Sequence, residues 1–394
     1  MSEIANTSLN TLASDAKAAG RLALDTEFMG EGRYRTLLCL IQLAVPVEIS
    51  DSAHPERIEL IDPLVQDLDG APLASVLADP AVQIVVHAGR QDVALMRRRF
   101  ATDVLNVFDT QVAAGFVGLG AQCSYDTLLA EILGVRVAKS ASFTRWDTRP
   151  LSSEQRAYAR EDVVHLLELA AELERRLDAL GRLEWAREEC CLLERSTDER
   201  DLDTVFARLP RIRGLSASSQ TIARELVQWR EHTAAAADRT VQSILSDAAL
   251  VELAKRKPST NSQLEQIRGV GAASLHRRAR ELLDAVRRGS ERPAEILQNE
   301  PRPAAPAPDD GPLIALAEAF VRARAREAGL AYELLAARAD LQAIVVAQRT
   351  DGEQADVRTL RGWRRELVGA ELLELLDGRV SLSIKDRTIR VTTD

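Results

Sequence analysis

Short apolar runs alternate with helix-like segments over the first half of the chain. The runs are rich in Val, Ile and Leu, and polar or Gly-containing stretches separate them, as is typical of buried strands. A helix is predicted at 90–99, and longer amphipathic helices at 152–180 and 182–195. Because strands alternate with helices, we expect a mixed α/β domain. The predicted strands are residues 20–26, 37–45, 57–61, 82–87 and 104–109.

The rest of the chain is predicted to be helical and to be divided by linkers. Residues 196–210 are polar and irregular, and 292–312 hold six prolines among Ala and Asp, which favours an extended spacer. The alternating stretch 380–392 indicates a hairpin with Lys385-Asp386 at its turn. The expected domains are an α/β domain at 1–195, a linker at 196–214, a helical domain at 215–291, a linker at 292–312, and a second helical domain with a C-terminal extension at 313–394.

Composition narrows the class of protein. The 394 residues are too many for one typical domain of about 150 residues. Apolar residues make up 46%, which excludes disorder as the dominant state, and aromatics only 4%, so the cores must be mainly aliphatic. The net charge of −9 argues weakly against nucleic-acid binding, but 211–292 hold 15 Lys and Arg against 9 Asp and Glu. This block is suited to a phosphate backbone, or is an ordinary solvated helical surface.

The cysteines and the N-terminal segment indicate the cellular compartment in which the protein is expected. Cys39, Cys123, Cys190 and Cys191 form no CxxC pair and show no zinc-like spacing with His. The first residues lack a basic start followed by a long apolar run, and no apolar stretch reaches the roughly 18–20 residues that span a bilayer. We therefore expect a reduced, cytoplasmic protein that does not enter a membrane.

Two carboxylates lie in the first predicted strand, in the run LDTEF at 24–28. Residues two apart in a strand point to the same face, so Asp25 and Glu27 project together. Two carboxylates so placed repel each other unless a cation lies between them, and a hard divalent ion prefers oxygen ligands. The alternative is an ordinary strand end without metal.

A third carboxylate follows the strand that ends at His87. In the run HAGRQDV at 87–93, a helix begins near Gly89, which puts Asp92 in its first turn. A helix start attracts negative charge through its free N–H groups and its dipole. Asp92 is therefore either a metal ligand or an ordinary helix-start acid.

A fourth carboxylate lies on a later helix, in the run YAREDV at 158–163. Tyr158 and Asp162 are four residues apart and share a helix face. Asp162 can bind metal while the Tyr158 hydroxyl, one turn earlier, hydrogen-bonds a water. An exposed polar pair is the alternative.

In order and spacing, these motifs resemble the DEDD exonuclease superfamily, and in particular its ribonuclease D family. Tyr158, four residues before Asp162 in the pattern Y-x3-D, is similar to the tyrosine of the branch called DEDDy. The resemblance covers about 20–195. Two positions depart from the family pattern: Arg145 stands where an acid usually precedes the tryptophan, with Asp147 after it, and Glu161 stands where a small residue is more common. Further similar segments are IQLA at 41–44, IDPL at 61–64, FDTQ at 108–111, LGV at 133–135, Lys139-Ser140 and RPLS at 149–152.

The resemblance implies a ribonuclease H-like fold and a 3′→5′ exoribonuclease that uses two Mg²⁺ or Mn²⁺ ions. It implies that Asp25, Glu27 and Asp162 bind the metal on the side of the attacking water. Asp25 would bridge to a second ion, Asp92 would hold that ion largely through water, and Tyr158 would orient the attacking water. Expected substrate contacts are Gln42, His87, Lys139 and Arg149, although Gln42 in an apolar strand can equally satisfy a backbone group.

The helical segments resemble the HRDC module that occurs in ribonuclease D. The match covers about 215–290 and includes WRE at 229–231 and ILSDAAL at 244–250, and 313–378 is read as a divergent second copy. The expected partner is the 3′ end of a structured RNA such as a tRNA precursor, with nucleoside 5′-monophosphates as products and no obligate protein partner. The alternative is that these helices only stabilise the nuclease fold or mediate self-association. The alternatives in function are a non-catalytic RNA-binding protein and a 3′→5′ DNA exonuclease.

Overall fold

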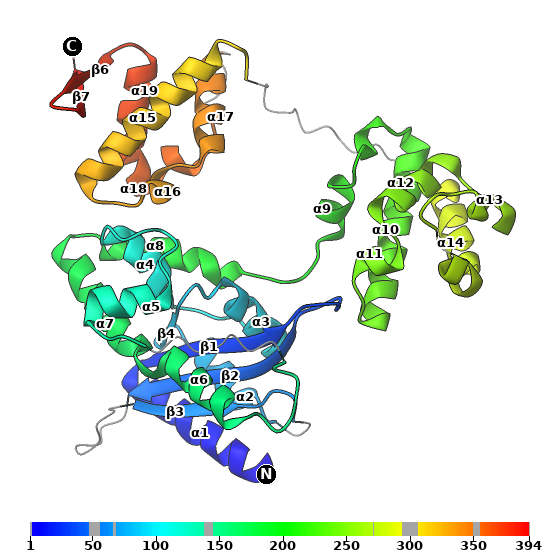
Figure 1. Cartoon of the computed structure of the whole chain (residues 1–394), viewed down its shortest axis with the longest axis horizontal. Helices are drawn as coiled ribbons and strands as arrows, with labels where there is room; N and C mark the ends of the chain where they lie inside the picture. The colour runs from blue at the N-terminus through cyan, green and yellow to red at the C-terminus, as the bar shows by residue number, and fades with distance from the viewer. Residues whose placement is uncertain are drawn as a thin grey trace. The chain divides into compact units, whose positions relative to one another are not determined.

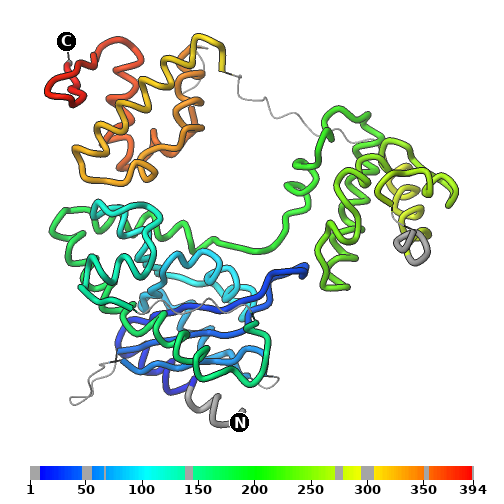
Figure 2. The backbone as a smooth tube through the Cα atoms, viewed as in Figure 1, coloured from blue at the N-terminus to red at the C-terminus, as the bar shows by residue number. Residues whose placement is uncertain are grey.

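The computed structural model describes residues 2–46, 56–65, 68–137, 145–270, 272–293, 306–349 and 355–393. Figure 2 traces its backbone. It divides the chain into two compact units. The nuclease unit comprises Met1–Glu27, Cys39–Thr197 and Pro301–Asp394. The helical unit comprises Phe28–Leu38 and Asp198–Glu300.

A mixed sheet forms the centre of the nuclease unit (Figure 1). In the described part of the chain its order is β3-β2-β1-β4-β5. β1 runs parallel to β4, and β4 parallel to β5, whereas β3 is antiparallel to β2. The mixed α/β fold that we expected is confirmed. The strands are β1 (Arg21–Met29), β2 (Leu37–Pro46), β3 (Glu56–Ile61), β4 (Gln83–Val86) and β5 (Val107–Asp109).

Helices pack around this sheet. No helix was predicted before β1, but α1 (Ser2–Ala19) lies there because Leu9, Leu12 and Ala16 recur at helical spacing and are buried. The single helix predicted at 152–180 is two helices, because His165 leaves the helical conformation with φ −116°. The other helices are α2 (Ala71–Leu77), α3 (Arg90–Phe100), α4 (Thr110–Phe116), α5 (Tyr125–Leu128), α6 (Ser153–Val164), α7 (Leu166–Ala179) and α8 (Leu183–Cys191).

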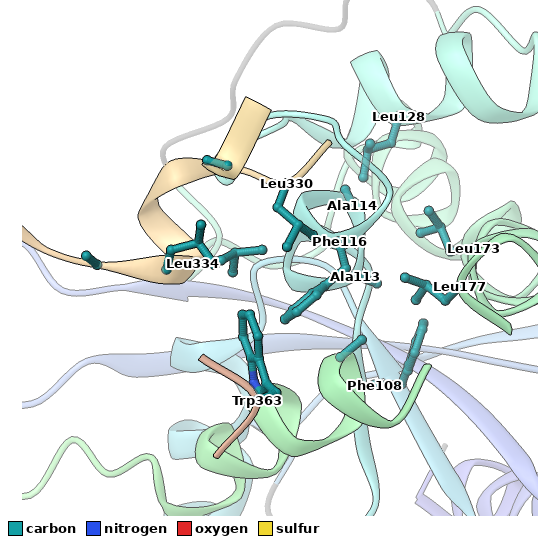
Figure 3. Close-up of a cluster of buried hydrophobic side chains, with 14 of the residues drawn as sticks. Phe108, Ala113, Ala114, Phe116, Leu128, Leu173, Leu177, Leu330, Leu334 and Trp363 are labelled. Atoms are coloured by element: carbon teal, nitrogen blue, oxygen red, sulfur yellow. The ribbon is translucent and has the colours of Figure 1, made fainter. Parts of the chain in front are cut away.

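The C-terminal segment shares a hydrophobic core with the α/β domain (Figure 3). The Trp363 ring stacks on Trp185 at 5.1 Å between ring centres and meets the edge of Phe116 at 5.2 Å. Beside them, Arg364 forms a 2.6 Å ion pair with Glu189. This segment therefore belongs to the nuclease unit. Its elements are α15 (Asp310–Ala328), α16 (Tyr332–Leu335), α17 (Arg338–Arg349), α18 (Gly362–Arg364), α19 (Ala370–Leu376), β6 (Val380–Lys385) and β7 (Thr388–Thr393).

The helical unit has a separate aliphatic core that includes Ile222, Leu226, Leu250 and Leu282. The stretch predicted as irregular at 196–210 contains a helix, α9, because the Asp201 carboxylate accepts hydrogen bonds from the backbone N–H groups that start it. The Pro/Ala spacer lies mostly outside the described residues. The helices are α9 (Leu202–Ala207), α10 (Ala217–Ala237), α11 (Val241–Ile244), α12 (Asp247–Arg256), α13 (Asn261–Glu265) and α14 (Ala272–Glu291).

Within the described ranges, every helix is too short or too polar to cross a bilayer.

Candidate active site

β1 carries the first two carboxylates. Asp25 and Glu27 are partly exposed, whereas Thr26 between them is buried, as the alternation of a strand requires. The Thr26 hydroxyl donates a hydrogen bond to Oδ1 of Asp92. Thr26 therefore ties β1 to the start of α3 and fixes one oxygen of a third carboxylate beside the first two.

The turn between β4 and α3 positions Asp92. Ala88 adopts a left-handed conformation with φ 53°, and a Cβ on Gly89 would lie 2.4 Å from a Val86 methyl, so only glycine fits there. Asp109, at the end of β5, accepts hydrogen bonds from the N–H groups of Ala88 at 3.1 Å and Gly89 at 2.9 Å. Asp92 then lies in the first turn of α3 and is buried.

α6 supplies Tyr158 and Asp162. A capping box starts this helix: Ser152 accepts from the Gln155 N–H, and the Gln155 side chain accepts from the Ser152 N–H. The buried Trp146 ring lies 6.0 Å from the Tyr158 ring. In the described structure, Oδ2 of Asp162 is buried and accepts no hydrogen bond. One oxygen of the site is thus left without a protein donor.

The four carboxylates affect one another's ionisation. Burial raises the pKa of Asp25 well above its usual range, and the charges of Asp92, Asp162 and Glu27 raise it further. Burial, together with the charges of Asp162 and Asp92, raises the pKa of Glu27 to about 8. Burial raises the pKa of Asp92 to about 6, although its hydrogen bond from Thr26 opposes the shift. The four side chains therefore occupy one shared electrostatic environment.

Two further acids act on Asp162. Burial raises its pKa to about 7, and the charges of Glu161 and Asp126 contribute to this shift. Glu161 is one of the two departures from the family pattern. Its effect is electrostatic, because it makes Asp162 harder to ionise.

The carboxylate cluster fits a divalent cation. It offers only oxygen donors, it contains a buried Asp162 oxygen without a donor, and its members repel one another. In the described ranges, no three His, Cys, Asp or Glu side chains already converge as a metal cage. A cation bound here would draw the carboxylates together and relieve their repulsion.

The four expected substrate contacts lie in different surroundings. Gln42 is fully buried in β2, and neither its amide oxygen nor its amide nitrogen has a hydrogen-bond partner in the described structure. Nδ1 of His87 lies 2.9 Å from the Thr110 hydroxyl, and its ring centre lies 5.5 Å from that of Tyr125. Lys139 lies outside the described residues.

Arg149 is bound tightly by the protein. Its guanidinium forms two hydrogen bonds with the Asp62 carboxylate, at 2.5 and 2.7 Å, and also donates to the Trp146, Thr148 and Cys39 carbonyl oxygens. These bonds use all five donors of a guanidinium. A phosphate contact from Arg149 would have to replace one of them.

The second departure from the family pattern is an ion pair. Nε of Arg145 donates to the Asp147 carboxylate at 3.0 Å. The acid that follows the tryptophan is therefore neutralised by the arginine that precedes it.

Sequence reasoning missed the residues that hold the site in place. Thr26 and Asp109 position Asp92, and Asp126 acts on Asp162. The run FDTQ at 108–111 contains Asp109 and was noted only as a family-like segment. Its place at the end of a predicted strand, where loops of an α/β sheet carry functional groups, was the available signal.

Comparison with known proteins decides the family. A 3′-5′ exonuclease model matches residues 4–178, and an HRDC domain model matches 219–286. The ribonuclease D of Granulibacter bethesdensis is 35% identical over 378 residues, which cover 94% of this chain and 91% of the relative. The chain belongs to the ribonuclease D family. The ribonuclease D of Acidiphilium cryptum is 33% identical over 94% of this chain and 91% of its own length.

A solved structure of a ribonuclease D is similar to this chain over nearly its whole length. The crystal structure of Escherichia coli RNase D has a TM-score of 0.75 and 26% sequence identity, over 95% of this chain and 97% of that one. The expected ribonuclease D resemblance, the exonuclease fold with an HRDC domain, and the enzyme class are confirmed: the protein is a 3′→5′ exoribonuclease. The individual roles of the site residues, the domain boundaries and the second HRDC-like domain stay predictions.

Proposed function

We propose that this ribonuclease D family member hydrolyses phosphodiester bonds at the 3′ ends of structured RNA, such as tRNA precursors, and releases nucleoside 5′-monophosphates. The observation that carries this proposal is the cluster of Asp25, Glu27, Asp92 and Asp162 with Tyr158 on the helix of Asp162. Structured RNA as the substrate class is supported by the Escherichia coli relative, which is described as an exoribonuclease involved in structured RNA processing.

The cofactors that we propose are two Mg²⁺ or Mn²⁺ ions. Asp25, Glu27 and Asp162 would hold one, and Asp25 with Asp92 the other, with Asp92 acting largely through water. Bound there, such ions lower the pKa of an attacking water and neutralise charge on the phosphate. The buried, unpartnered Asp162 oxygen and the mutual repulsion of the carboxylates support this assignment.

Tyr158 would orient the attacking water rather than remove its proton. Burial, reinforced by the charge of Asp162, raises the pKa of the Tyr158 phenol above its ordinary value of about 10. The phenol is therefore protonated at neutral pH, where it can donate one hydrogen bond and accept another. The backbone of α6 places Tyr158 one helical turn before Asp162.

The test is digestion of a 3′-labelled tRNA precursor and a matched DNA, with Mg²⁺, Mn²⁺ or a chelator. The wild type should shorten the RNA from its 3′ end with a divalent ion, release 5′-monophosphates, and stop with the chelator. Asp25→Asn should be inactive. The matched control is Asp178→Asn, the same change at an exposed position on α7, which should keep full activity. Activity retained by a clean Asp25→Asn preparation would contradict the site, and preference for DNA would contradict the substrate.

A further inference from the structure

A groove with a basic lining lies on the C-terminal part of the nuclease unit. Its volume is about 550 Å³, and it runs between α15 and the β6–β7 hairpin. Arg322 and Arg326 come from α15, and Arg387 and Arg390 from the hairpin. Ala319, Ala323 and Glu327 also line it, and the Glu327 carboxylate is paired with Arg324 at 2.6 Å. We call this feature the arginine groove.

The arginines of this groove differ from others in the same segment. Arg322 pairs with Glu318 at 2.9 Å, but Arg326, Arg387 and Arg390 are exposed and have no acidic partner among the residues that the structure describes. Unpaired cations so close together repel one another and favour an anion between them. Arginines of this segment outside the groove are paired: Arg324 with Glu371, Arg349 with Asp310, Arg358 with Asp340, and Arg379 with Asp377.

The hairpin turn places an arginine where glycine would be favoured. Asp386 and Arg387 both have positive φ, at 51° and 62°. A two-residue hairpin turn with both residues in this region strongly prefers Asp-Gly or Asn-Gly. Arg387 is therefore unfavourable for the local backbone. An interaction of its guanidinium, which lines the groove, would offset this cost.

We propose that the arginine groove binds the sugar–phosphate backbone of RNA away from the 3′ end that is being cleaved. Guanidinium groups match phosphate oxygens in geometry and charge. Ile389 adds an apolar surface for a ribose, whereas the Thr388 hydroxyl already donates to the Lys385 carbonyl oxygen at 2.6 Å. The substrate of an exoribonuclease is a polyanion, and the groove lies in the same compact unit as the carboxylate cluster.

A simpler explanation exists for one of the three arginines. Arg326 lies in the last turn of α15, where the helix dipole attracts a cation. Neither Arg387 nor Arg390 has this explanation, because both belong to the hairpin. The test therefore rests on the hairpin arginines.

The experiment compares Arg387→Gly, Arg390→Ala and the double variant with the wild type. Arg387→Gly creates the favoured Asp-Gly turn, so its thermal midpoint should equal or exceed that of the wild type. Binding of a tRNA precursor, measured with chelator over a range of salt concentrations, should weaken about tenfold in the double variant, and the salt slope should fall by about 1–2. Hydrolysis of a trinucleotide, a short substrate that tests the cleavage site itself, should be unchanged.

The control is Arg361→Ala, which removes one exposed arginine of the same segment outside the groove. It should leave precursor binding close to that of the wild type. Unchanged precursor affinity and salt slope in the double variant would overturn the proposal and leave an acidic protein surface as the class of ligand to examine. An equal loss on the trinucleotide would also overturn it, because the effect would then lie at the cleavage site.

Discussion

At the residue scale, the proposed role of Tyr158 is in the reaction step and not in metal binding. Its hydroxyl belongs to the same helix face as Asp162, and its raised pKa keeps it protonated. In the proposed site the carboxylates, and not Tyr158, would hold the cations. Loss of the hydroxyl should therefore affect the rate and not the affinity for metal.

The first prediction is that Tyr158→Phe lowers kcat by about 10²-fold or more, since a positioned proton-bearing group typically contributes that much. The Mn²⁺ affinity, measured by titration calorimetry, should change little. Trp146 packs against the ring of Tyr158 in either case, so the fold should be preserved. Equal losses in kcat and in Mn²⁺ affinity would contradict a positioning role.

A second residue-scale prediction concerns Glu161. Its charge is, after burial, the largest influence that raises the pKa of Asp162 to about 7. Because Asp162 must be ionised to bind a cation, Glu161→Gln should lower this pKa and move the acid limb of the pH–rate profile to lower pH. The measurement is kcat/KM between pH 5 and 8 at a metal concentration well below saturation, where protons and the ion compete for Asp162. Glu154→Gln, at an exposed position on the same helix, serves as the control. An acid limb that stays in place would rule out this influence.

Strand alternation and helical spacing predict which of these side chains share a face, and the family resemblance singles them out as candidate site residues. Asp25 and Glu27 lie on one face of β1, and Tyr158 and Asp162 one turn apart on α6. Thr26 could not be found in this way, because its function depends on the approach of α3, 66 residues later in the chain. The same limit applies to Gln42, whose burial without a hydrogen-bond partner is a tertiary property.

At the element scale, the turn between β4 and α3 is held by hydrogen bonds to a residue of another strand, Asp109 of β5. Asp109 joins this turn to α4, because its carboxylate accepts from Ala88 and Gly89 and also from Gln111 and Val112. The sequence predicts the strand and helix on either side of the turn. It does not show that the Asp109 carboxylate, at the end of β5, holds both this turn and the start of α4.

The third prediction is that Asp109→Asn destabilises the protein by about 1–3 kcal/mol, because an amide NH₂ then faces a buried N–H donor. Metal affinity should fall as well, since Asp92 follows the turn that Asp109 holds. Urea unfolding and Mn²⁺ titration measure the two effects. Asp79→Asn is the control, because Asp79 accepts one N–H, that of Ala81, in an exposed turn. Wild-type stability and metal affinity in Asp109→Asn would refute the role.

At the scale of the whole molecule, the C-terminal segment is a part of the nuclease unit. The helical periodicity of residues 313–377 predicts which faces are apolar but not what covers them. The structure shows that Trp363 and Leu334 pack on α4 and α8 of the α/β domain, where a Cβ on Gly115 would lie 2.9 Å from Leu334 (Figure 3). The position of the arginine groove relative to the cleavage site therefore depends on this shared core.

The last prediction concerns the stability of the whole protein without metal. Glu27, with a pKa of about 8, and Asp162, with a pKa of about 7, bind protons more tightly in the folded state than in the unfolded one. Stability falls with rising pH wherever the folded state binds more protons, so the metal-free protein should be less stable at pH 8 than at pH 6.

Bound metal should reverse this order, because it stabilises the folded state most where the carboxylates are ionised. With chelator, thermal unfolding should give a lower midpoint at pH 8 than at pH 6, by roughly 2–4 °C for each kcal/mol of repulsion. Excess Mg²⁺ should raise the midpoint more at pH 8 than at pH 6. Asp162→Asn removes one of the raised groups, so it should flatten the pH dependence and raise the metal-free midpoint at pH 8 while it abolishes activity. If the metal-free wild type instead became more stable between pH 6 and pH 8, repulsion among these carboxylates would not govern the stability of the fold.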